Sequence, residues 1–182
     1  MRIPSRACRA FVASSWLLAG LIGLGGCATA PAPMTHNDPH HAERLKILSV
    51  AERLIGTPYV LGGKSPSGMD CSGLVQYAYS QAGIQVPRTS AAQFRAGQPQ
   101  RRVRPGDLLF FRTTSAGVVS HVGIYAGQGQ MIHASSGSGR IRKVSLDQPY
   151  WRKRLVGGTT FLDSIQRDPV VRRGTASARP PG

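Results

Sequence analysis

The hydrophobic pattern of this chain changes its period once, near Pro105, and that change limits the possible folds more than any other feature. Before it, apolar residues recur at helical spacing over 45–55, 70–81 and 90–97. After it, short apolar runs alternate with glycine-rich turns. These runs cover 108–112, 121–126, 131–134, 141–145 and 155–159. Helices followed by an antiparallel sheet predict an α+β fold.

The ends of the expected helices carry recognisable capping residues. In the first helix, Leu45, Leu48, Ala51 and Ile55 share one face, which we expect to be buried, and Gly56 is suited to end it. The second helix is expected to start at Asp70 and to end before Gly83, and the third to start at the capping residue Ser90 and to end near Gly97.

The first 27 residues have the pattern of an export signal. Three arginines and no acidic residue precede an apolar stretch from Ala10 to Leu24, which is too short and glycine-rich for a membrane span. The stretch ends in Leu24-Gly25-Gly26-Cys27, which resembles the lipobox of bacterial lipoproteins. We therefore expect a lipid anchor at Cys27 and, with Ala28 following it, the periplasmic face of the outer membrane.

Composition divides the rest of the chain into three parts. Residues 28–41 are rich in Pro, Ala, Thr and His and are expected to be a flexible tether. Residues 42–163 carry the periodic pattern of a domain, and residues 164–182 form a basic tail that we expect to be disordered.

The net charge is strongly positive and favours an anionic partner. It is +15 for the whole chain, and +12 without the three arginines of residues 1–27. Export argues against nucleic acid and leaves an anionic polymer or a membrane surface. A charge that serves only solubility is the alternative interpretation.

Cys71 has no partner for a disulfide. Of the three cysteines, Cys8 belongs to the signal and Cys27 would carry lipid. An unpaired thiol in an oxidising compartment is either buried and inert or retained for its reactivity. Cys71 lies on the expected first turn of a helix, where N–H groups and the helix dipole stabilise a thiolate, so we expect a lowered pKa.

A nucleophilic cysteine needs a base, and the sheet region offers His121 and His133. A three-residue loop at 127–129 would pair Ala126 with Gln130 and place both histidines on one face as diagonal neighbours. A loop of two or four residues would place them on opposite faces. Ordinary structural histidines, or zinc bound by Cys71, His121 and His133, remain alternatives on this evidence.

Several further motifs accompany these residues in a fixed order. They are Gly56-Thr57-Pro58-Tyr59, Asp70-Cys71-Ser72-Gly73-Leu74-Val75, Pro87-Arg88-Thr89-Ser90, Pro105-Gly106-Asp107-Leu108-Leu109-Phe110-Phe111, His121-Val122-Gly123-Ile124-Tyr125, His133-Ala134 and Tyr150-Trp151. In this order they resemble the NlpC family of papain-like cell-wall cysteine peptidases, over nearly all of residues 42–160.

The resemblance implies roles for particular residues. Cys71 would be the nucleophile, His121 the general base, His133 the residue that orients it, and Tyr59 an oxyanion contact. The implied fold is a reduced papain-like one, with the cysteine helix packed on the sheet that carries the histidines. Candidates for lining the groove are Asp70, Ser72, Arg88 and Ser90, each of which has a cap or turn role as its alternative.

The implied substrate is the stem peptide of peptidoglycan, cut without a cofactor or metal. The chain has the layout of a single-domain lipoprotein, which favours the D-alanyl–diaminopimelate cross-link as the bond that is cut. The alternatives are the γ-D-glutamyl–diaminopimelate bond, an amidase or acyltransferase activity, and a wall-binding lipoprotein without catalysis. Because uncontrolled wall cleavage is lethal, a regulatory protease or adaptor is an expected partner.

Overall fold

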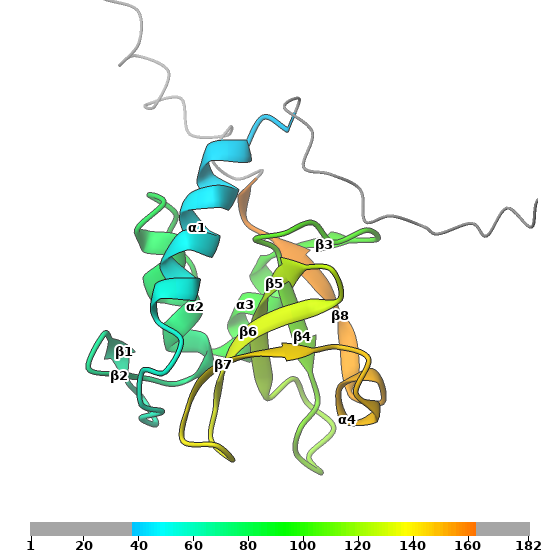
Figure 1. Cartoon of the computed structure of the whole chain (residues 1–182). Coiled ribbons are helices and arrows are strands. Elements are labelled where there is room, and N and C mark those ends of the chain that lie inside the picture. Colours follow the sequence, from blue (N-terminus) through cyan, green and yellow to red (C-terminus); the bar gives the residue numbers. More distant parts are fainter. Residues whose placement is uncertain (1–37, 163–182) are drawn as a thin grey trace, which may run out of the picture. The chain divides into compact units, whose positions relative to one another are not determined.

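A computed structural model describes residues 38–162, which carry four helices and eight strands (Figure 1). The helices are α1 (His41–Arg53), α2 (Cys71–Ser80), α3 (Ser90–Ala96) and α4 (Pro149–Arg152). The strands are β1 (Lys64–Ser65), β2 (Gly68–Met69), β3 (Gln98–Gln100), β4 (Leu108–Phe111), β5 (His121–Gly127), β6 (Gln130–Ser135), β7 (Arg140–Ser145) and β8 (Leu155–Thr160). The signal, Cys27, most of the tether and the basic tail lie outside the described residues.

Six strands form one antiparallel sheet in the order β3-β8-β4-β5-β6-β7, and β1 pairs with β2 in a separate ribbon. The predicted α+β class is confirmed, and all five predicted strands are present with ends shifted by one residue at most. The ribbon, β3 and α4 were not predicted, because two to four residues are too few to show a period.

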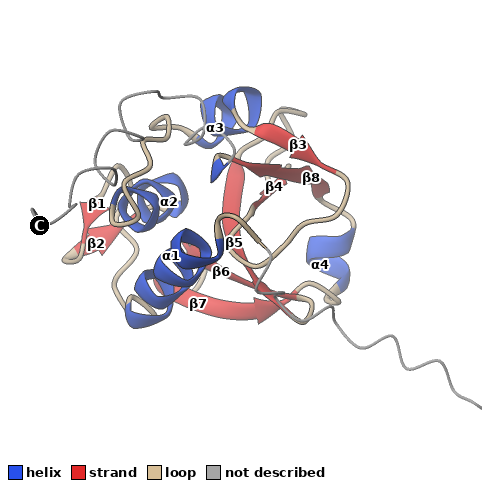
Figure 2. Cartoon of the chain, turned by 90° about the horizontal axis from the view of Figure 1, so that it is seen from above, coloured by secondary structure: helices blue, strands red, loops and turns tan. Residues whose placement is uncertain are grey.

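The sheet has apolar side chains on both faces. Leu108 and Phe110 of β4 belong to the main core, under α1, α2 and α3, whereas Leu109 and Phe111 point to a smaller cluster with Trp151 of α4. Figure 2 shows α1 and α2 on one side of the sheet and α4 on the other. This alternation follows from the two-residue period of a strand.

The buried face of α1 differs from the predicted one. Leu45 and Ile55 are each 44% exposed, and Ile47, Val50 and Arg44 are buried instead. The difference arises because a charged residue belongs to the buried stripe, which an apolar pattern cannot reveal. Leu48 and Ala51 do contact the core, as predicted.

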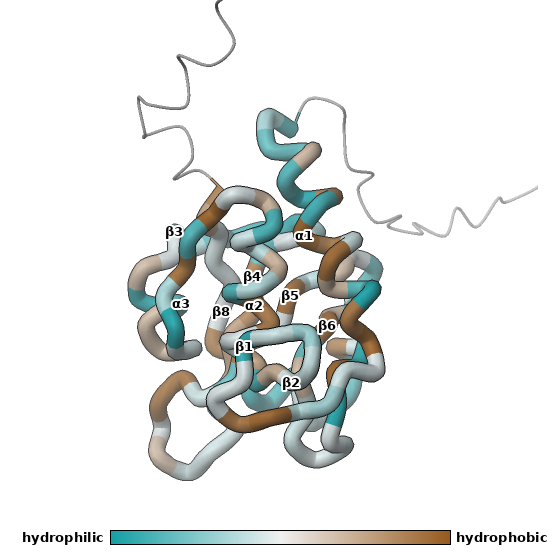
Figure 3. Tube along the Cα trace, turned by 90° about the vertical axis from the view of Figure 1, so that its left-hand side faces the viewer, coloured by the Kyte–Doolittle hydropathy of each residue, from teal (hydrophilic) through white to brown (hydrophobic). Residues whose placement is uncertain are grey.

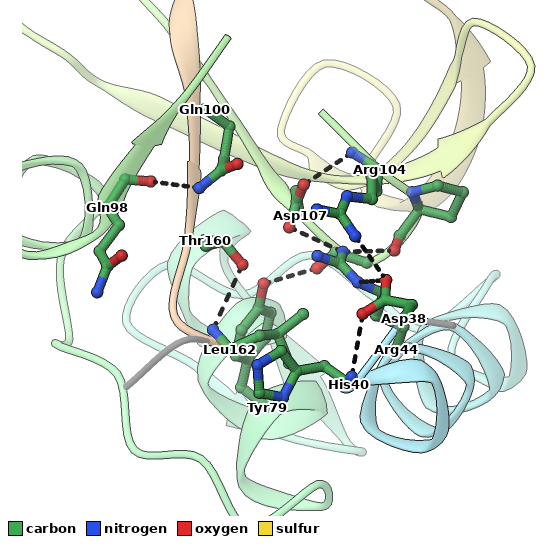
Figure 4. Close-up of polar contacts among 12 residues, drawn as sticks. Asp38, His40, Arg44, Tyr79, Gln98, Gln100, Arg104, Asp107, Thr160 and Leu162 are labelled. Atoms are coloured by element: carbon green, nitrogen blue, oxygen red, sulfur yellow. Dashed lines mark hydrogen bonds and ion pairs between the residues drawn. The ribbon is translucent and has the colours of Figure 1, made fainter. Parts of the chain in front are cut away.

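The arginine is buried because it is paired. Arg44 Nη1 lies 2.8 Å from Asp107 Oδ1, and its Nε lies 2.8 Å from Asp38 Oδ2 (Figure 4). Asp38 also accepts a hydrogen bond from the His40 backbone N–H at 3.0 Å. The folded part therefore includes residues 38–41, which the sequence assigned to the tether.

The helix that carries Cys71 starts as predicted, and the next one does not. Asp70 accepts the N–H of Gly73 at 2.7 Å and caps α2. At α3 the capping residue is Thr89, which accepts from Ala92, so that Ser90 is the first helical residue. Two adjacent hydroxyl residues made the cap ambiguous by one position. Among residues 38–162, no helix is long and apolar enough to cross a membrane.

Candidate active site

Cys71 is the first residue of α2, and the β1–β2 ribbon holds this end of the helix in place. Asp70 accepts N–H groups from Gly73 and from Gly62, the latter at 3.0 Å, and its own N–H donates to the Gly63 carbonyl at 3.1 Å. A Cβ on Gly73 would overlap that carbonyl oxygen. Figure 3 shows the ribbon in front of α2. The close approach explains why a glycine follows two residues after the cysteine.

The thiol of Cys71 is half-buried, at the place where α2 meets β5. Burial raises its pKa, and the backbone N–H groups of Val122, Ser72 and Cys71 act in the opposite direction. The lowered pKa expected from the helix position is therefore wrong for the free protein. Desolvation, together with the negative charge of the nearby Asp70 carboxylate, raises the thiol pKa by more than the backbone N–H groups lower it.

His121 and His133 lie on the same face of the sheet and touch. Ile124 pairs with Ile132 in β5 and β6, the register that the sequence predicted. The turn is tighter than predicted, because Gly127 pairs with Gln130 and the extra residue forms a bulge at Ala126. His121 Nε2 lies 2.9 Å from His133 Nδ1.

Burial keeps both imidazoles neutral near pH 7. It lowers the pKa of His121 to about 4. It also lowers the pKa of His133 to about 3, with further contributions from His121 and Arg142. Because Nε2 of His121 faces His133, the His121 nitrogen left for a second partner is Nδ1. A tautomer with the proton on Nε2 would leave Nδ1 free to accept one.

The Cys71 sulfur lies beside the backbone of β5, the strand that begins with His121. The backbone N–H of Val122, which directly follows His121, donates a hydrogen bond to the Cys71 sulfur and lowers the thiol pKa. The N–H groups of Cys71 and Ser72 also act on it from the first turn of α2. The three predicted catalytic residues thus lie on α2, β5 and β6, with the two histidines in contact and the sulfur beside the backbone of β5.

Trp151 is the site residue to which the sequence assigned no role. Its ring stacks on His121, with centroids 5.6 Å apart and planes at 24°, and meets His133 edge-on at 4.9 Å. Both histidines and Trp151 line a pocket of about 350 Å³, together with Thr113, Ser135, Ser136, Gly137 and Tyr150. A single tryptophan does not contribute to a periodic hydrophobic pattern. The only sequence signal for Trp151 was therefore its place in the Tyr150-Trp151 motif.

Tyr59 lies beside the cysteine, as predicted. Its N–H donates to the Gly139 carbonyl at 2.8 Å, and it bridges to Met69, next to the start of α2. Burial, with the charges of Cys71 and Asp70, raises the pKa of the phenol. The hydroxyl therefore stays protonated at neutral pH and can donate a hydrogen bond beside the sulfur.

Three of the four predicted groove residues, Asp70, Ser72 and Arg88, form one network beside Cys71. Arg88 Nη2 pairs with Asp70 Oδ2 at 2.6 Å, and its Nη1 donates to Ser72 Oγ at 2.8 Å. Asp70 and Ser72 are buried, whereas the Arg88 side chain remains 34% exposed. Of these three residues, only Arg88 has a charged group that is accessible to solvent. Ser90 is partly buried at the start of α3.

The alternative of a zinc site gains no support from the geometry of the side chains. Within residues 38–162, no three His, Cys, Asp or Glu side chains are grouped closely enough to hold a metal ion. A thiol beside a neutral imidazole, which a second imidazole orients, is instead the arrangement of nucleophilic catalysis by acyl transfer.

Comparison with known proteins yields a match that covers most of this domain. The model of the NlpC/P60 family matches residues 56–160. The chain is 41% identical to the γ-DL-glutamyl hydrolase of Bacillus subtilis, over 76% of its own length and 34% of the relative. It is also 41% identical to the murein DD-endopeptidase MepH of Escherichia coli, over 69% of its own length and 50% of the relative. The chain thus spans half or less of these two relatives.

The fold has a solved counterpart as well. The crystal structure of an NlpC/P60 family protein from Bacillus cereus superposes with a TM-score of 0.62 at 31% identity. The superposition covers 65% of this chain and 40% of that one.

Proposed function

The chain belongs to the NlpC/P60 family, and from this premise we propose that it is a peptidoglycan endopeptidase with a Cys-His-His thiol mechanism. The observation that carries the proposal is the contact between His121 of β5 and His133 of β6, together with the hydrogen bond from the backbone N–H of Val122, also in β5, to the Cys71 sulfur. Its relatives named as a glutamyl hydrolase and a murein endopeptidase support a cell-wall peptide as substrate.

The first half of the reaction follows from the protonation states of the free site. With the thiol and both imidazoles neutral, the Cys71 proton passes to His121 as the sulfur attacks the scissile carbonyl carbon. The His121 imidazolium forms only then, and the proton on its Nε2 remains hydrogen-bonded to His133 Nδ1. The N–H groups of Cys71 and Ser72 and the Tyr59 hydroxyl are the donors nearest the developing oxyanion.

The second half returns the site to its resting state. His121 gives its proton to the leaving amine as the C–N bond breaks, which leaves an acyl group on the Cys71 sulfur. A water molecule then loses a proton to His121 and attacks the thioester carbonyl. The C–S bond breaks, and the sulfur regains its proton from His121.

The D-alanyl–diaminopimelate cross-link is our choice for the bond. The relative named as a DD-endopeptidase supports it. The relative named as a γ-DL-glutamyl hydrolase is equally identical and supports the γ-D-glutamyl–diaminopimelate bond as the second candidate.

We also propose that the protein acts from a membrane anchor in the cell envelope. The support is the sequence alone: a basic start, an apolar stretch and the Leu24-Gly25-Gly26-Cys27 ending. Mass spectrometry of the purified protein would show a diacylglyceryl group on Cys27, and Cys27→Ser would abolish it. An unmodified Cys27 would contradict the anchor.

The test of the activity is digestion of purified peptidoglycan by the protein and by Cys71→Ala, with mass analysis of the fragments. Cross-linked dimers should disappear only with the intact protein. Shortening of tetrapeptides to dipeptides would move the bond to γ-D-glutamyl–diaminopimelate. Binding to the wall without any Cys71-dependent product would show a wall-binding protein and overturn the proposal.

A further inference from the structure

A second hollow adjoins the pocket of the two histidines. It has a volume of about 440 Å³ and is lined by Arg112, Thr113, Thr114, Ser115, Lys153 and Arg154. Thr113 lines both hollows, so they share a wall. The loop after β4 and the segment after α4 form this second hollow, which we call the cation pocket.

The lining of the cation pocket has three positive charges and no negative one. Within residues 38–162, none of its three cations forms an ion pair with a carboxylate. Elsewhere in this part of the chain, Arg44, Arg88 and Arg104 are each paired with an aspartate. Three cations around one concave surface attract an anion more strongly than scattered ones, because their fields add.

One of the cations lies at the border with the catalytic pocket. The Arg154 guanidinium lies 4.0 Å from the centre of the Tyr150 ring, and its Nη1 donates to the Tyr150 carbonyl at 3.1 Å. Tyr150 itself lines the pocket of the histidines. The backbone N–H of Arg112 donates to the Arg154 carbonyl at 3.0 Å, which brings these two cations together.

The wall between the hollows is held by hydrogen bonds. Ser120 Oγ accepts the N–H of Thr113 at 2.8 Å and lies 2.9 Å from its hydroxyl. Ser120 directly precedes His121, so the loop that forms this wall is tied to the base of β5. The position of the cation pocket is thereby fixed relative to the catalytic histidine.

The direction of proton transfer determines which part of a substrate lies on the side of the histidine pocket and the cation pocket. His121 must give its proton to the leaving amine, so the leaving component lies by the histidines and Trp151. We assign the acyl component to the side of Tyr59 and Arg88, which both interact electrostatically with Cys71 and line neither hollow. Beyond the histidine pocket, the leaving component meets the cation pocket.

Both candidate bonds release the same kind of amine. Whether the acyl group is D-alanyl or γ-D-glutamyl, the amine belongs to diaminopimelate. At the D-alanyl cross-link, the carbon that bears this amine also bears a free carboxylate. At the γ-D-glutamyl bond of a tetrapeptide, the corresponding carboxyl is bound to D-alanine, so only the D-alanyl cross-link offers a free carboxylate to the cation pocket. We propose that the cation pocket is a subsite for this carboxylate and selects leaving groups that carry a negative charge. The proposal rests on the proposed endopeptidase function, because that function supplies the leaving group.

The test compares two double variants that remove the same charge. Arg112→Gln with Lys153→Gln removes two cations of the pocket. Arg101→Gln with Arg102→Gln removes two exposed cations in the bend after β3 and controls for general attraction to an anionic polymer. The substrates are cross-linked muropeptides with diaminopimelate either as the free acid or as the amide at the leaving carbon.

For the free acid, the pocket variant should lose roughly five- to tenfold in kcat/KM, mainly through KM, since each exposed charge pair contributes modestly. For the amide, the pocket variant and the wild-type protein should be equal within a factor of about two. The control variant should treat both substrates as the wild-type protein does. Equal loss on acid and amide, or an equal loss in the control, would overturn the subsite.

A binding measurement separates this proposal from the activity on which it rests. In calorimetry with Cys71→Ala, meso-diaminopimelate should bind more tightly than its diamide, and the two pocket substitutions should remove the difference. If the wild-type protein cleaves neither substrate, the endopeptidase function fails, and this calorimetry still decides the subsite. Equal binding of acid and amide would refute the subsite even if cleavage is observed.

Discussion

In the proposed mechanism, His133 acts on the reaction only through His121. Its Nδ1 lies 2.9 Å from His121 Nε2, while Trp151 covers both rings. When His121 Nε2 carries the proton in this contact, Nδ1 is free to accept the thiol proton, as the proposed mechanism requires. His133 is therefore a positioning residue, and an acceptor other than imidazole should partly replace it.

We predict that His133→Ala lowers kcat/KM by roughly 10²-fold, near the lower end of what general base catalysis contributes. His133→Asn should retain a larger fraction of the activity, because an amide oxygen can accept the proton on His121 Nε2. The measurement is muropeptide cleavage by both variants, with circular dichroism as a control of folding. Equal activity of the two variants would show that the hydrogen bond does not matter.

Among the structural elements, α2 controls the position of the nucleophile. Asp70 caps this helix and pairs with Arg88 on the neighbouring segment. Although burial raises the pKa of the Asp70 carboxyl, the hydrogen bonds from Arg88, Gly73 and Gly62 lower it overall. The carboxylate thus serves as both cap and ion-pair partner, and these two roles can be separated by substitution.

Asp70→Asn retains a capping oxygen and loses the charge, whereas Asp70→Ala loses both. We expect the alanine variant to lose roughly 2–3 kcal/mol of unfolding free energy, of which about 1 kcal/mol is the cap. The asparagine variant should lose less. Urea unfolding measures both, and the rate of Cys71 alkylation reports whether the start of α2 has moved. Equal stability of the two variants would contradict a capping role.

At the scale of the whole domain, a buried ion pair joins the first helix to the start of the sheet. Asp107 is fully buried directly before β4, and it accepts from Arg44 Nη1 at 2.8 Å and from the Arg104 N–H at 2.7 Å. Arg44 Nη1 also donates to the Pro105 carbonyl at 2.9 Å. Tyr79 of α2 donates to the neighbouring Gly106 carbonyl at 2.6 Å, so both main helices converge on this turn (Figure 4).

Removing Asp107 would leave the buried Arg44 guanidinium with one carboxylate, Asp38, in place of two. We predict that Asp107→Ala lowers the free energy of unfolding by about 3–5 kcal/mol. Replacing Arg44 with Met at the same time should recover part of the loss, because the buried guanidinium is then absent and Asp38 keeps its ion pair with Arg104. Chemical denaturation of the single and double variants checks this. A double variant as unstable as Asp107→Ala would contradict the explanation.

The buried histidines make the stability of the domain depend on pH. Their pKa values are lowered from 6.5 to about 4 for His121 and to about 3 for His133, so the folded state binds fewer protons than the unfolded state in this range. Stability should be fully present above pH 6.5 and should fall as the pH drops toward 4. For His121 the loss is on the order of 3 kcal/mol.

Unfolding by urea between pH 7 and pH 4 measures this loss, and a His121→Asn variant should show a smaller one. The lowered carboxyl pKa values of Asp38 and Asp70 act only below about pH 4, outside this range. A pH dependence that is unchanged in His121→Asn would contradict the assignment to the histidine.

The sequence by itself determined the features that depend on local chemistry. The α+β class and the helix at Cys71 with Asp70 as its cap follow from spacing, because periods and caps act over a few residues. The shared face of His121 and His133 followed only for one of the loop lengths that the sequence allowed. A three-residue loop at 127–129 predicted the observed register of β5 and β6, but loops of two or four residues remained open alternatives, and the bulge at Ala126 was missed.

Tertiary structure alone decided the features that depend on burial between distant segments. The pKa of the Cys71 thiol rises because α2 packs against β5, which no helix-terminus argument includes. Arg44 turns inward because Asp107 lies 63 positions away in the sequence but next to it in space. Trp151 covers the histidines, and Lys153 joins the cation pocket, because the chain returns to β4 after α4. Such contacts form between segments that are far apart in the sequence, and no local pattern in a single sequence indicates which segments will meet.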